Sequence, residues 1–471
     1  MVLTQCRREE EEGQKDNICV KIALREPKTE EVREIKTAKT ITIKATPRLR
    51  GEITVPGDKS ISHRSIIFNA IANGSARITN FLPGEDCLSS LDCMQAMGVA
   101  FELSEDKREV KIEGVGLHGL KEPGEVLNAG NSGTTTRLLV GLLSGQNFFS
   151  ILTGDMSLRS RPMGRVIGPL KEMGAQIWGR KGDTLAPLAI KGSPLKGVDY
   201  ALPVASAQLK SCLLLAALYA EGETRLTGLI ASRDHTERML SAMGTPLRVS
   251  ETEIVVAGPA SRLQAQNVEI PGDISSAAFW LVAASVHPDA DLLLKNVGVN
   301  PTRTGIIDVL NEMGADLTRL NEREVAGEPV ADLRVRSARL RATTIGGAII
   351  PRLVDEIPAL AVAALFSQGR SVVQDAAELR VKETDRIATI ASEFARLGAT
   401  VETQLDGLSL IGRPKLQGNT VKSFGDHRLA MALAIAGLLL PKGEAVQIED
   451  YACADVSYPG FWEDLERVAE E

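Results

Sequence analysis

The feature that most constrains the fold is a helix ending that recurs at nearly even spacing. The segments MQAMGVAF, LKEMGAQI, LSAMGTPL, LNEMGADL and FARLGATV each place a glycine directly before a strand-like run. These glycines are Gly98, Gly174, Gly244, Gly314 and Gly398, spaced 76, 70, 70 and 84 residues apart. Glycine closes a helix because it adopts the left-handed conformation without strain. Since FWEDLERVAEE falls about where a sixth such helix would lie, the chain predicts six copies of one α/β unit.

A second set of predicted helices has no polar face. These segments are rich in alanine and poor in charge, and they span Thr136–Leu143, Gln208–Ala220, Ser275–Val286, Ile357–Phe366 and Leu429–Leu440. A helix that is apolar all round must be buried on every side. We therefore expect an inside-out α/β barrel in each of two domains, with buried parallel helices inside and sheets outside. Each domain is expected to contain three βαβαββ-type units.

Two similar turns mark the expected passages between the domains. Pro56-Gly57-Asp58 is matched about half a chain later by Pro271-Gly272-Asp273, and serines and an apolar helix follow each turn. Such a pair favours two crossings between two domains. We expect hinges near 56–58 and 271–273, a first domain over 57–271, and a second domain made of 40–56 plus 272–471. Residues 1–39 are rich in glutamate and lack the apolar segment of a secretory signal, so we expect a mobile N-terminal extension.

Composition excludes several classes of protein. The 471 residues carry a net charge of −7, which argues against a partner that is nucleic acid or a membrane surface. The longest apolar run, Leu429–Leu440, is shorter than the roughly 18 residues that a membrane span needs. The six cysteines are scattered without a C-x-x-C pair, so we expect a cytoplasmic protein with no disulfide framework and no metal site. An anionic ligand must then be held by a local cluster of cations.

The segment VPGDKSISHRS, residues 55–65, has the chemistry of an anion site. Lys59 and Arg64 supply charge, Ser60 supplies a hydroxyl, and Asp58 stands where a helix N-cap belongs. A helix that begins here presents free backbone N–H groups beside a lysine. A capped surface helix with solvated charges is the alternative.

The segment NAGNSGTTTR, residues 128–137, is a second candidate anion site. Its small residues let the backbone approach a ligand, and its N–H groups can form an anion-binding nest. It is not a P-loop, because no G-K-[ST] follows the glycines; a threonine-rich helix cap is the alternative. Upstream, Gly114–Gly119 matches G-x-G-x-x-G, but a Lys-Glu-Pro turn follows it instead of a helix, so a dinucleotide site is not supported.

Three further segments of the first half carry candidate ligands. GDMSLRSRPMGR contains three arginines, including Arg161, which suit bidentate binding of phosphate or carboxylate, although a solvated loop is the alternative. VASAQLK places Ser206 and Gln208 at the start of an apolar helix, where a simple cap is nearly as good an interpretation. Arg233 adds another possible cation, with a surface loop as the safer interpretation.

The second half contributes carboxylates as well as cations. Asp355 begins an apolar helix, where its alternative role is an N-cap. In RVKETDRI, we expect Lys382 and Arg386 four residues apart on one helix face, which requires an anion between them. Glu383 beside them can exchange a proton. GDHRLAM adds Arg428, while His427 is better interpreted as a structural imidazole. Together these clusters suit proton transfer between two small anionic substrates.

The motifs PGDKSISHR, GNSGTTTR, SLRSRPMGR, ASAQLKS, VKETDR and GDHRLAM, in this order, resemble the 5-enolpyruvylshikimate-3-phosphate (EPSP) synthase family of enolpyruvyl transferases. The resemblance covers about Thr40 to the C-terminus. It implies two domains of three repeated units with helices inside, and the shikimate pathway of aromatic amino-acid biosynthesis. The implied reaction passes the carboxyvinyl group of phosphoenolpyruvate to the 5-hydroxyl of shikimate 3-phosphate through a tetrahedral intermediate, and phosphate leaves. The resemblance implies no cofactor and small-molecule substrates as the partners, and we expect a monomer.

The resemblance also implies roles for individual residues. The shikimate 3-phosphate ligands would be Lys59, Ser60, Arg64, Ser206, Ala207, Gln208, Arg233, Asp355 and Lys382, with Ala207 replacing a serine of some members. The phosphoenolpyruvate ligands would be Lys59, Gly133, Arg161, Gln208, Arg386 and Arg428, with Asn131, Thr134 and Arg137 completing the first loop. Asp355 would be the base for the 5-hydroxyl, Glu383 the proton donor to the methylene carbon, and Lys59 a third catalytic residue. Val456 stands where some members have a lysine contact.

Two alternatives stay open at the level of sequence. The sister transferase that acts on UDP-N-acetylglucosamine typically has Lys-Asn near its start and a cysteine in a mobile loop, whereas Lys59 is followed here by Ser60. A non-catalytic sensor of phosphate ligands on the same fold would not need Asp355, Lys382 and Glu383 together.

Overall fold

Six small sheets, each with its own helices, make up the part of the chain that this computed structural model describes, residues 39–413 and 415–470. Five of the sheets share one strand order, in which the leading strand pairs in parallel with the second, and the fourth lies between the second and the third. The sixth sheet has three strands and begins with the same parallel pair. The predicted six-unit α/β fold is confirmed. The predicted extension lies outside the described residues, except for Lys39.

Three units follow one another between residues 57 and 271. The first contains α1 (Lys59–Ala70), β3 (Asn73–Thr79), α2 (Glu85–Ala96), β4 (Ala100–Leu103) and β5 (Val110–Val115). The second contains β6 (Leu127–Asn128), α3 (Gly133–Ser144), β7 (Phe149–Thr153), α4 (Gly164–Glu172), β8 (Gln176–Gly179), α5 (Arg180–Asp183) and β9 (Leu185–Lys191). The third contains β10 (Asp199–Leu202), α6 (Ala207–Ala217), β11 (Gly222–Gly228), α7 (His235–Ala242), β12 (Leu247–Val249) and β13 (Ile254–Gly258), and β14 (Val268–Glu269) then returns to lead the first sheet.

The other three units use both ends of the described chain. The fourth contains β2 (Arg48–Ile53), α8 (Ile274–Val286), β15 (Ala290–Gly298), α9 (Gly305–Met313), β16 (Asp316–Val325) and β17 (Glu328–Arg336). The fifth contains β18 (Thr344–Ile345), α10 (Ile357–Phe366), β19 (Arg370–Val373), α11 (Arg386–Arg396), β20 (Val401–Thr403) and β21 (Leu408–Ile411). The sixth contains β22 (Asn419–Lys422), α12 (His427–Leu438), β23 (Ala445–Glu449) and α13 (Phe461–Val468), and it is completed by β1 (Thr40–Lys44).

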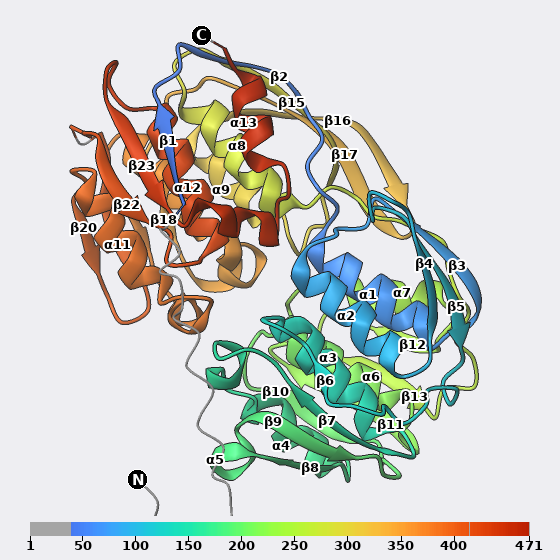
Figure 1. The fold of residues 1–471 in the computed structure, drawn as a ribbon. Coiled ribbons are helices and arrows are strands. Elements are labelled where there is room, and N and C mark those ends of the chain that lie inside the picture. Colours follow the sequence, from blue (N-terminus) through green and yellow to red (C-terminus); the bar gives the residue numbers. More distant parts are fainter. Residues whose placement is uncertain (1–38, 414, 471) are drawn as a thin grey trace, which may run out of the picture. The chain divides into compact units, whose positions relative to one another are not determined.

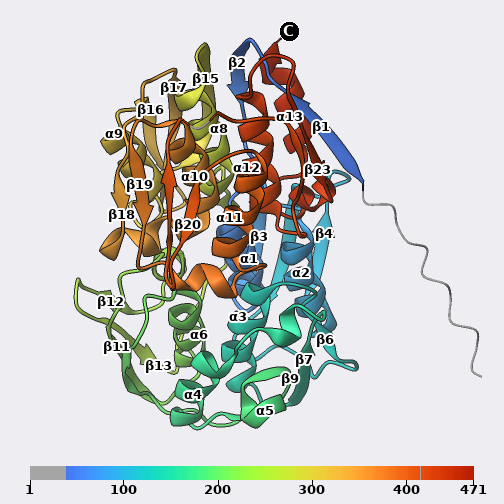
Figure 2. The same cartoon turned by 90° about the vertical axis from the view of Figure 1, so that its left-hand side faces the viewer.

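The first and last described segments lie side by side. Strand β1 pairs antiparallel with β23, and β24 (Ala469–Glu470) pairs with β2 (Figures 1 and 2). Because β2 leads the fourth sheet while the chain proceeds into α1, the chain leaves this half of the fold after β2 and returns to it after β14.

The two predicted classes of helix are both present. All five glycines that end the repeated helices have positive φ angles, between 86° and 99°, as a left-handed helix end requires. The apolar helices α3, α6, α8, α10 and α12 are buried along almost their whole length. Helix α1 is buried in the same way, although it was not among the predicted apolar helices. Its sequence is partly polar because Ser62, His63 and Arg64 make hydrogen bonds inside the protein.

Two separate hydrophobic cores hold the described residues together. One is built from residues between Ile61 and Ile270, and the other from residues between Ile43 and Val55 and between Ile274 and Val468. The boundaries between the two cores fall at the predicted crossings, between Val55 and Ile61 and between Ile270 and Ile274. On this basis we keep the division into domains 57–271 and 40–56 plus 272–471 as a proposal.

The two crossings are hydrogen-bonded to each other. The Asp58 backbone N–H donates to the Pro271 carbonyl and the Asp273 N–H donates to the Pro56 carbonyl, both at 2.8 Å. A Cβ atom on Gly57 would lie 1.9 Å from the Asn80 carbonyl oxygen, so only glycine fits at this place. The turn thus brings the starts of α1 and α8 together.

We expect Gly57→Ala to destabilise the protein by about 2 kcal/mol or more, because a backbone carbonyl must move to admit the methyl group. Urea unfolding measures the change. The matched control is Gly124→Ala, since a Cβ atom there meets nothing within 4 Å. Equal stability of the two variants would contradict the close contact at the crossing.

None of the helices among the described residues is long and apolar enough to span a membrane.

Candidate active site

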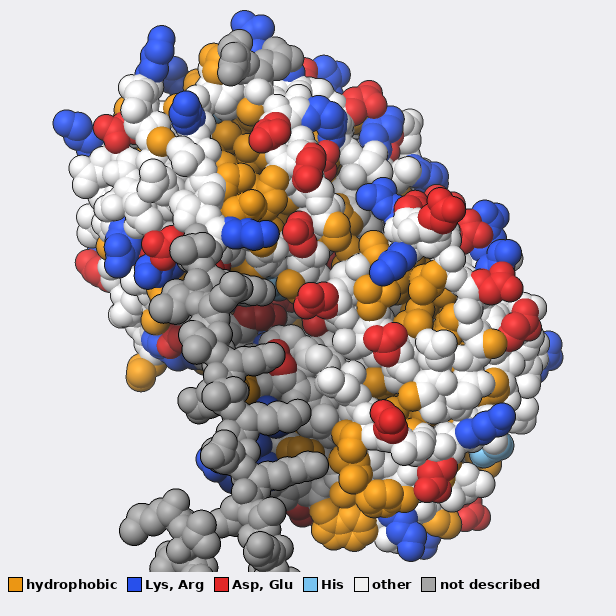
Figure 3. Space-filling view, viewed as in Figure 1, with side chains coloured by type: hydrophobic (Ala, Val, Ile, Leu, Met, Phe, Trp, Pro, Cys, Tyr) orange, Lys and Arg blue, Asp and Glu red, His pale blue; other side chains and the backbone are white. Residues whose placement is uncertain are grey.

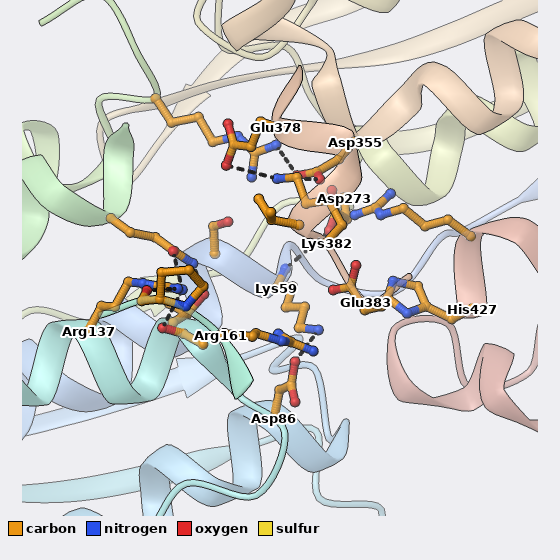
Figure 4. Close-up of a pocket in the computed structure, with 18 of the residues that line it drawn as sticks. Lys59, Asp86, Arg137, Arg161, Asp273, Asp355, Glu378, Lys382, Glu383 and His427 are labelled. Atoms are coloured by element: carbon orange, nitrogen blue, oxygen red, sulfur yellow. Dashed lines mark hydrogen bonds and ion pairs between the residues drawn. The ribbon is translucent and has the colours of Figure 1, made fainter. Parts of the chain in front are cut away.

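The largest concentration of charged side chains lies around a cavity of about 310 Å³ beside the crossings. Side chains from both halves of the fold point into it (Figure 4). Its lining comprises Lys59, Ser60, Asp86, Gly133, Thr134, Arg137, Arg161, Pro162, Arg165, Gln208, Arg233, Asp273, Arg303, Asp355, Glu378, Val381, Lys382, Glu383, His427 and Arg428. A smaller adjoining cavity of about 100 Å³ shares several of these residues and adds Ser206 and Ala207.

The cavity is cationic although the chain is acidic. Eight lysine or arginine side chains and five carboxylates line it, whereas the whole chain has a net charge of −7. On the face shown in Figure 3, acidic and basic side chains are intermixed, without a large patch of one sign. The attraction for an anion is therefore local to the cavity, as the sequence predicted.

Lys59 enters the cavity from the start of α1. Asp58 caps this helix by accepting the Ile61 N–H at 2.9 Å, which fixes the first turn. The Lys59 ammonium pairs with Asp86 at the start of α2. Burial lowers the pKa of Lys59, but the Asp86 carboxylate outweighs it and raises the pKa overall. Lys59 is thus a fixed cation; Asp86, two residues after Gly84, was missed by the sequence analysis.

A cluster of guanidinium groups lies on the side of the cavity formed by α3 and α4. Arg137 Nη1 donates to Gln208 Oε1 at 2.8 Å, and Arg165 Nη2 reaches the same oxygen at 3.4 Å. Arg161 donates to the Asn131 carbonyl at 3.4 Å. Burial, together with the neighbouring Arg165 and Arg161, lowers the pKa of Arg137. Because crowded cations destabilise one another, a bound anion here would relieve the repulsion.

Backbone from the GNSGTTTR segment adjoins this cluster. A Cβ atom on Gly133 would lie 2.7 Å from Arg137 Nη1, so any side chain at this position would clash with the guanidinium group. Ser132 caps α3 by accepting the Thr135 N–H at 3.1 Å. The Thr134 hydroxyl accepts from Gln208 Nε2 at 3.0 Å, which connects α3 to the start of α6.

Asp355 is the carboxylate on which cations from both halves converge. Arg233 binds its Oδ2 from the first half, while Lys382 and Arg386 approach Oδ1 at 3.3 and 3.4 Å. Burial raises the pKa of Asp355, but Lys382, Arg233, Arg428 and Arg386 together hold it well below its usual range. The N-cap alternative is not supported, since Glu356 precedes α10 and makes no side-chain cap.

The predicted shared helix face of Lys382 and Arg386 is wrong. Lys382 follows the short 3₁₀ turn Ala377–Val381 in extended conformation, and α11 begins only at Arg386, capped by Asp385. Asp385 fixes the start of the helix by accepting the Ala388 N–H at 3.1 Å, so Lys382 stays outside the helix. Both cations nevertheless approach the Asp355 carboxylate, at 3.3 and 3.4 Å.

Glu383 is held ionised in this arrangement. Its carboxylate accepts from Arg386 Nη2 at 2.6 Å. Burial raises the pKa of Glu383, but Arg386, His427 and Lys382 lower it well below its usual range. Arg386 itself is 1% exposed and also binds Asp426, the N-cap of α12. Glu383 can therefore donate a proton only after bound anions have neutralised the neighbouring cations.

Most of the predicted site residues are brought together. Those that line the larger cavity are Lys59, Ser60, Gly133, Arg161, Gln208, Arg233, Asp355, Lys382, Glu383 and Arg428. Ser206 and Ala207 line the smaller one. Arg64 and Arg386 line neither cavity. The Arg64 guanidinium is bound instead by Thr236 at 2.8 Å, Ser211 at 2.7 Å and the Ser60 carbonyl at 3.0 Å.

Some residues that line the cavity carry little or no signal in the sequence. Glu378 pairs with Lys382 at 3.3 Å and lies 4.0 Å from Arg165 of the other half. Its only sequence signal is its place four residues before Lys382. Arg303 has no signal, because its partners are distant in sequence. Val456 is not among the lining residues and belongs to the 3₁₀ turn Tyr451–Val456.

Among the described residues, no group of three or more His, Cys, Asp or Glu side chains is arranged to hold a metal ion.

We expect the unfolding free energy to fall as the pH drops from 6.5 to 4.5. Burial lowers the pKa of His427 to about 4 and that of His63 to about 3, whereas the unfolded chain binds these protons near pH 6.5. The unfolded state then holds about two more protons, which costs about 2.7 kcal/mol per pH unit. Chemical unfolding over this range measures the slope.

His63→Gln should lower this slope by one proton, about 1.4 kcal/mol per pH unit, while His118→Gln serves as the matched histidine control. An unchanged slope in His63→Gln would contradict the buried neutral imidazole.

Comparison with known proteins gives consistent results. The family model described as EPSP synthase (3-phosphoshikimate 1-carboxyvinyltransferase) matches residues 43–465. A 3-phosphoshikimate 1-carboxyvinyltransferase of Chloroflexus aurantiacus is 58% identical over 92% of this chain and 99% of its own length. One from Gloeobacter violaceus is 56% identical over 90% of this chain and 98% of its own length.

Solved structures agree with the sequence relatives. EPSP synthase from Acinetobacter baumannii superposes with a TM-score of 0.82 and 44% identity, covering 92% of this chain and 98% of that one. An enolpyruvyl transferase from Streptomyces tendae superposes with a TM-score of 0.75 over 92% of this chain and 98% of that one. It is 16% identical and so supports the fold alone.

Proposed function

The chain belongs to the EPSP synthase family of enolpyruvyl transferases, and we propose that the cationic cavity beside the crossings is where it carries out the family reaction. The reaction transfers the carboxyvinyl group of phosphoenolpyruvate to the 5-hydroxyl of shikimate 3-phosphate and releases phosphate. It is a step of the shikimate pathway, which leads to chorismate and the aromatic amino acids.

The reaction proceeds by addition and elimination, and both steps move protons. In the addition, the 5-hydroxyl oxygen bonds to C2 of phosphoenolpyruvate and loses its proton, while C3 gains a proton and becomes a methyl group. In the elimination, the bond from C2 to the phosphate oxygen breaks, and the methyl carbon returns a proton. The site needs one group that accepts a proton and one that donates a proton.

The observation that carries the proposal is that two carboxylates lining a cationic cavity share one buried cation behind it. Arg386 contacts Asp355 at 3.4 Å and Glu383 at 2.6 Å. Asp355, held ionised, is the base for the 5-hydroxyl. Glu383 donates to C3 once the anionic substrates offset the cations that lower its pKa. Lys59, which lies between the two halves, stabilises negative charge as it develops on the reacting groups.

The remaining cations divide between the two substrates. We propose that Arg161, which lies beside Gly133, and Arg428 bind the carboxylate and phosphate of phosphoenolpyruvate, and that the buried Arg386 supports them without touching the ligand. Shikimate 3-phosphate binds along the adjoining smaller cavity, where Ser206, Ala207 and Gln208 begin α6. The free N–H groups of that helix start suit its phosphate. Ser60, Arg233 and Lys382 complete this side, and Arg64 supports it from behind by donating to the Ser60 carbonyl.

The acceptor is tested by phosphate release from phosphoenolpyruvate in parallel reactions. One contains shikimate 3-phosphate, and the other UDP-N-acetylglucosamine; neither receives metal or nucleotide. We expect release only with shikimate 3-phosphate. Release only with the sugar nucleotide would assign the chain to the sister activity. Binding of shikimate 3-phosphate by calorimetry without release in either reaction would indicate a sensor.

We also propose that the chain acts in the cytoplasm as a monomer. One chain supplies the lining of the cavity from both halves of the fold, so the site needs no second copy. Light scattering across a range of protein concentrations, combined with turnover, tests this. Turnover that falls in step with dissociation of an oligomer would contradict it.

A further inference from the structure

A buried arginine outside every predicted motif joins the starts of two helices at the crossings. Arg303 Nη1 lies 3.0 Å from Asp58 Oδ2, and Arg303 Nη2 lies 3.0 Å from Asp273 Oδ1. Asp58 is the N-cap of α1 and Asp273 is the N-cap of α8. We call Arg303, Asp58 and Asp273 the clasp. The guanidinium thus spans the two places where the chain passes between its hydrophobic cores.

The clasp is almost wholly removed from solvent. The side chains of Arg303, Asp58 and Asp273 are 3%, 5% and 5% exposed. Burial lowers the pKa of Arg303, but Asp58 and Asp273 outweigh it and raise the pKa. A buried ion pair is strongly disfavoured when one partner is removed, because the other charge is left uncompensated. Each of the three charged groups therefore keeps the other two in position.

The clasp reaches the two sides of the proposed active site. On one side, Asp273 Oδ2 accepts the backbone N–H of Lys59 at 3.3 Å, and Lys59 follows Asp58 directly. On the other side, Arg303 Nη2 donates to the Ser275 hydroxyl at 2.7 Å, and that hydroxyl binds Glu356. Glu356 is the residue after Asp355. Lys59 and Asp355, two of the three proposed catalytic residues, are thus each one residue away from a member of this network.

Arg303 is poorly placed to bind substrate itself, although it lines the cavity. Its Nη1 is used by Asp58, with His235 Nε2 at 3.5 Å, and its Nη2 is used by Asp273 and Ser275. A substrate anion would have to displace a paired carboxylate to reach either nitrogen. The arrangement suits a residue that acts through others.

We propose that Arg303 is a positioning residue of the transfer reaction, which sets Lys59 and Asp355 opposite each other by clasping the starts of α1 and α8. This role rests on the proposed function of the cavity. A small misplacement of reacting groups is enough to reduce turnover by about a hundredfold. Lysine cannot replace this arginine, because one ammonium does not present the fork that spans two carboxylates.

The test compares Arg303→Lys with the double variant Asp58→Asn/Asp273→Asn and with the triple variant. Asparagine keeps a cap oxygen for each helix but removes the charge. The matched control is Arg334→Lys, because Arg334 also makes two guanidinium hydrogen bonds to carboxylate, here to the single Asp291 at 2.9 and 2.7 Å on the surface of the fourth sheet. For each folded variant, kcat and both KM values are measured, together with the dissociation constant of shikimate 3-phosphate.

We expect kcat to fall at least tenfold in Arg303→Lys and in the double variant, while the dissociation constant changes less than threefold. The triple variant should be no slower than the double, since the residues act as one unit. Arg334→Lys should match the unmodified protein. Three results would overturn the role: unchanged kcat in folded Arg303→Lys, additive losses in the triple variant, or a dissociation constant that weakens as much as kcat falls.

Hydrogen exchange of the unliganded protein separates the clasp from the proposed function. Arg303→Lys should speed amide exchange in peptides that contain Lys59 and in peptides that contain Asp355, but Arg334→Lys should not. The unmodified protein could fail to turn over these substrates while Arg303→Lys still speeds exchange at both places. That combination would retain the clasp and reject the proposed function. Unaltered exchange at either place would reject the clasp, whatever the activity.

Discussion

Asp355→Asn is expected to reduce kcat about a thousandfold, because an amide cannot take the proton of the 5-hydroxyl. Shikimate 3-phosphate should still bind, since the change removes a negative charge from a site for anions. In the free protein, Lys382, Arg233 and Arg386 all surround this carboxylate, so the variant also frees cations for the ligand. Steady-state turnover and calorimetry separate the two effects.

The control for this variant is Asp291→Asn, which removes the negative charge of a carboxylate that is also paired with arginine, but outside the cavity. It should leave kcat unchanged. If Asp355→Asn turned over at the rate of the unmodified protein, Asp355 would have no part in the proton transfer. If instead it lost binding and turnover by the same factor, its role would be that of a ligand.

Glu383→Gln is expected to lower kcat by about a hundredfold or more, with both substrates still bound. Glutamine keeps an acceptor for Arg386 but has no proton to give to the methylene carbon. Because the free protein holds Glu383 ionised, the donor is formed only in the complex. The fall in kcat should therefore exceed any change in either KM. Glu402→Gln, which alters an exposed carboxylate bound by Arg370, is the control. Full turnover in Glu383→Gln would place the donor elsewhere.

Much of the fold follows from local sequence signals. Gly98, Gly174, Gly244, Gly314 and Gly398 close helices through a backbone conformation that depends on the residue itself, so their spacing predicts the six units. The buried helices were also predictable, because their apolar character does not depend on any partner. The burial of helix α1 was harder to predict. Its polar residues His63 and Arg64 are hydrogen-bonded to Ser90 and Ser211, which lie far away in the sequence.

The candidate site was predictable to the extent that its residues stand at helix starts. Lys59, Ser206 and Asp355 carry such a signal, although polar residues are also common there as helix caps, and Ser206 does cap α6. Glu378 and Arg303 carry none. Arg303 and Asp58 are 245 residues apart, and nothing in either segment indicates the other. The conformation around Lys382 was mispredicted because the spacing of the charges does not show that the helix begins only after Asp385.

The addition and elimination reaction in this cavity is tested most directly by running the transfer in D2O and measuring deuterium in the product. Proton addition at C3 makes a methyl group with one solvent-derived hydrogen, and elimination removes only one of the three. We expect deuterium in the methylene group of the product. We also expect Glu383→Gln to form this product more slowly than the unmodified protein. A product formed at full rate with only the original hydrogens on that carbon would contradict protonation at C3 and the role of Glu383.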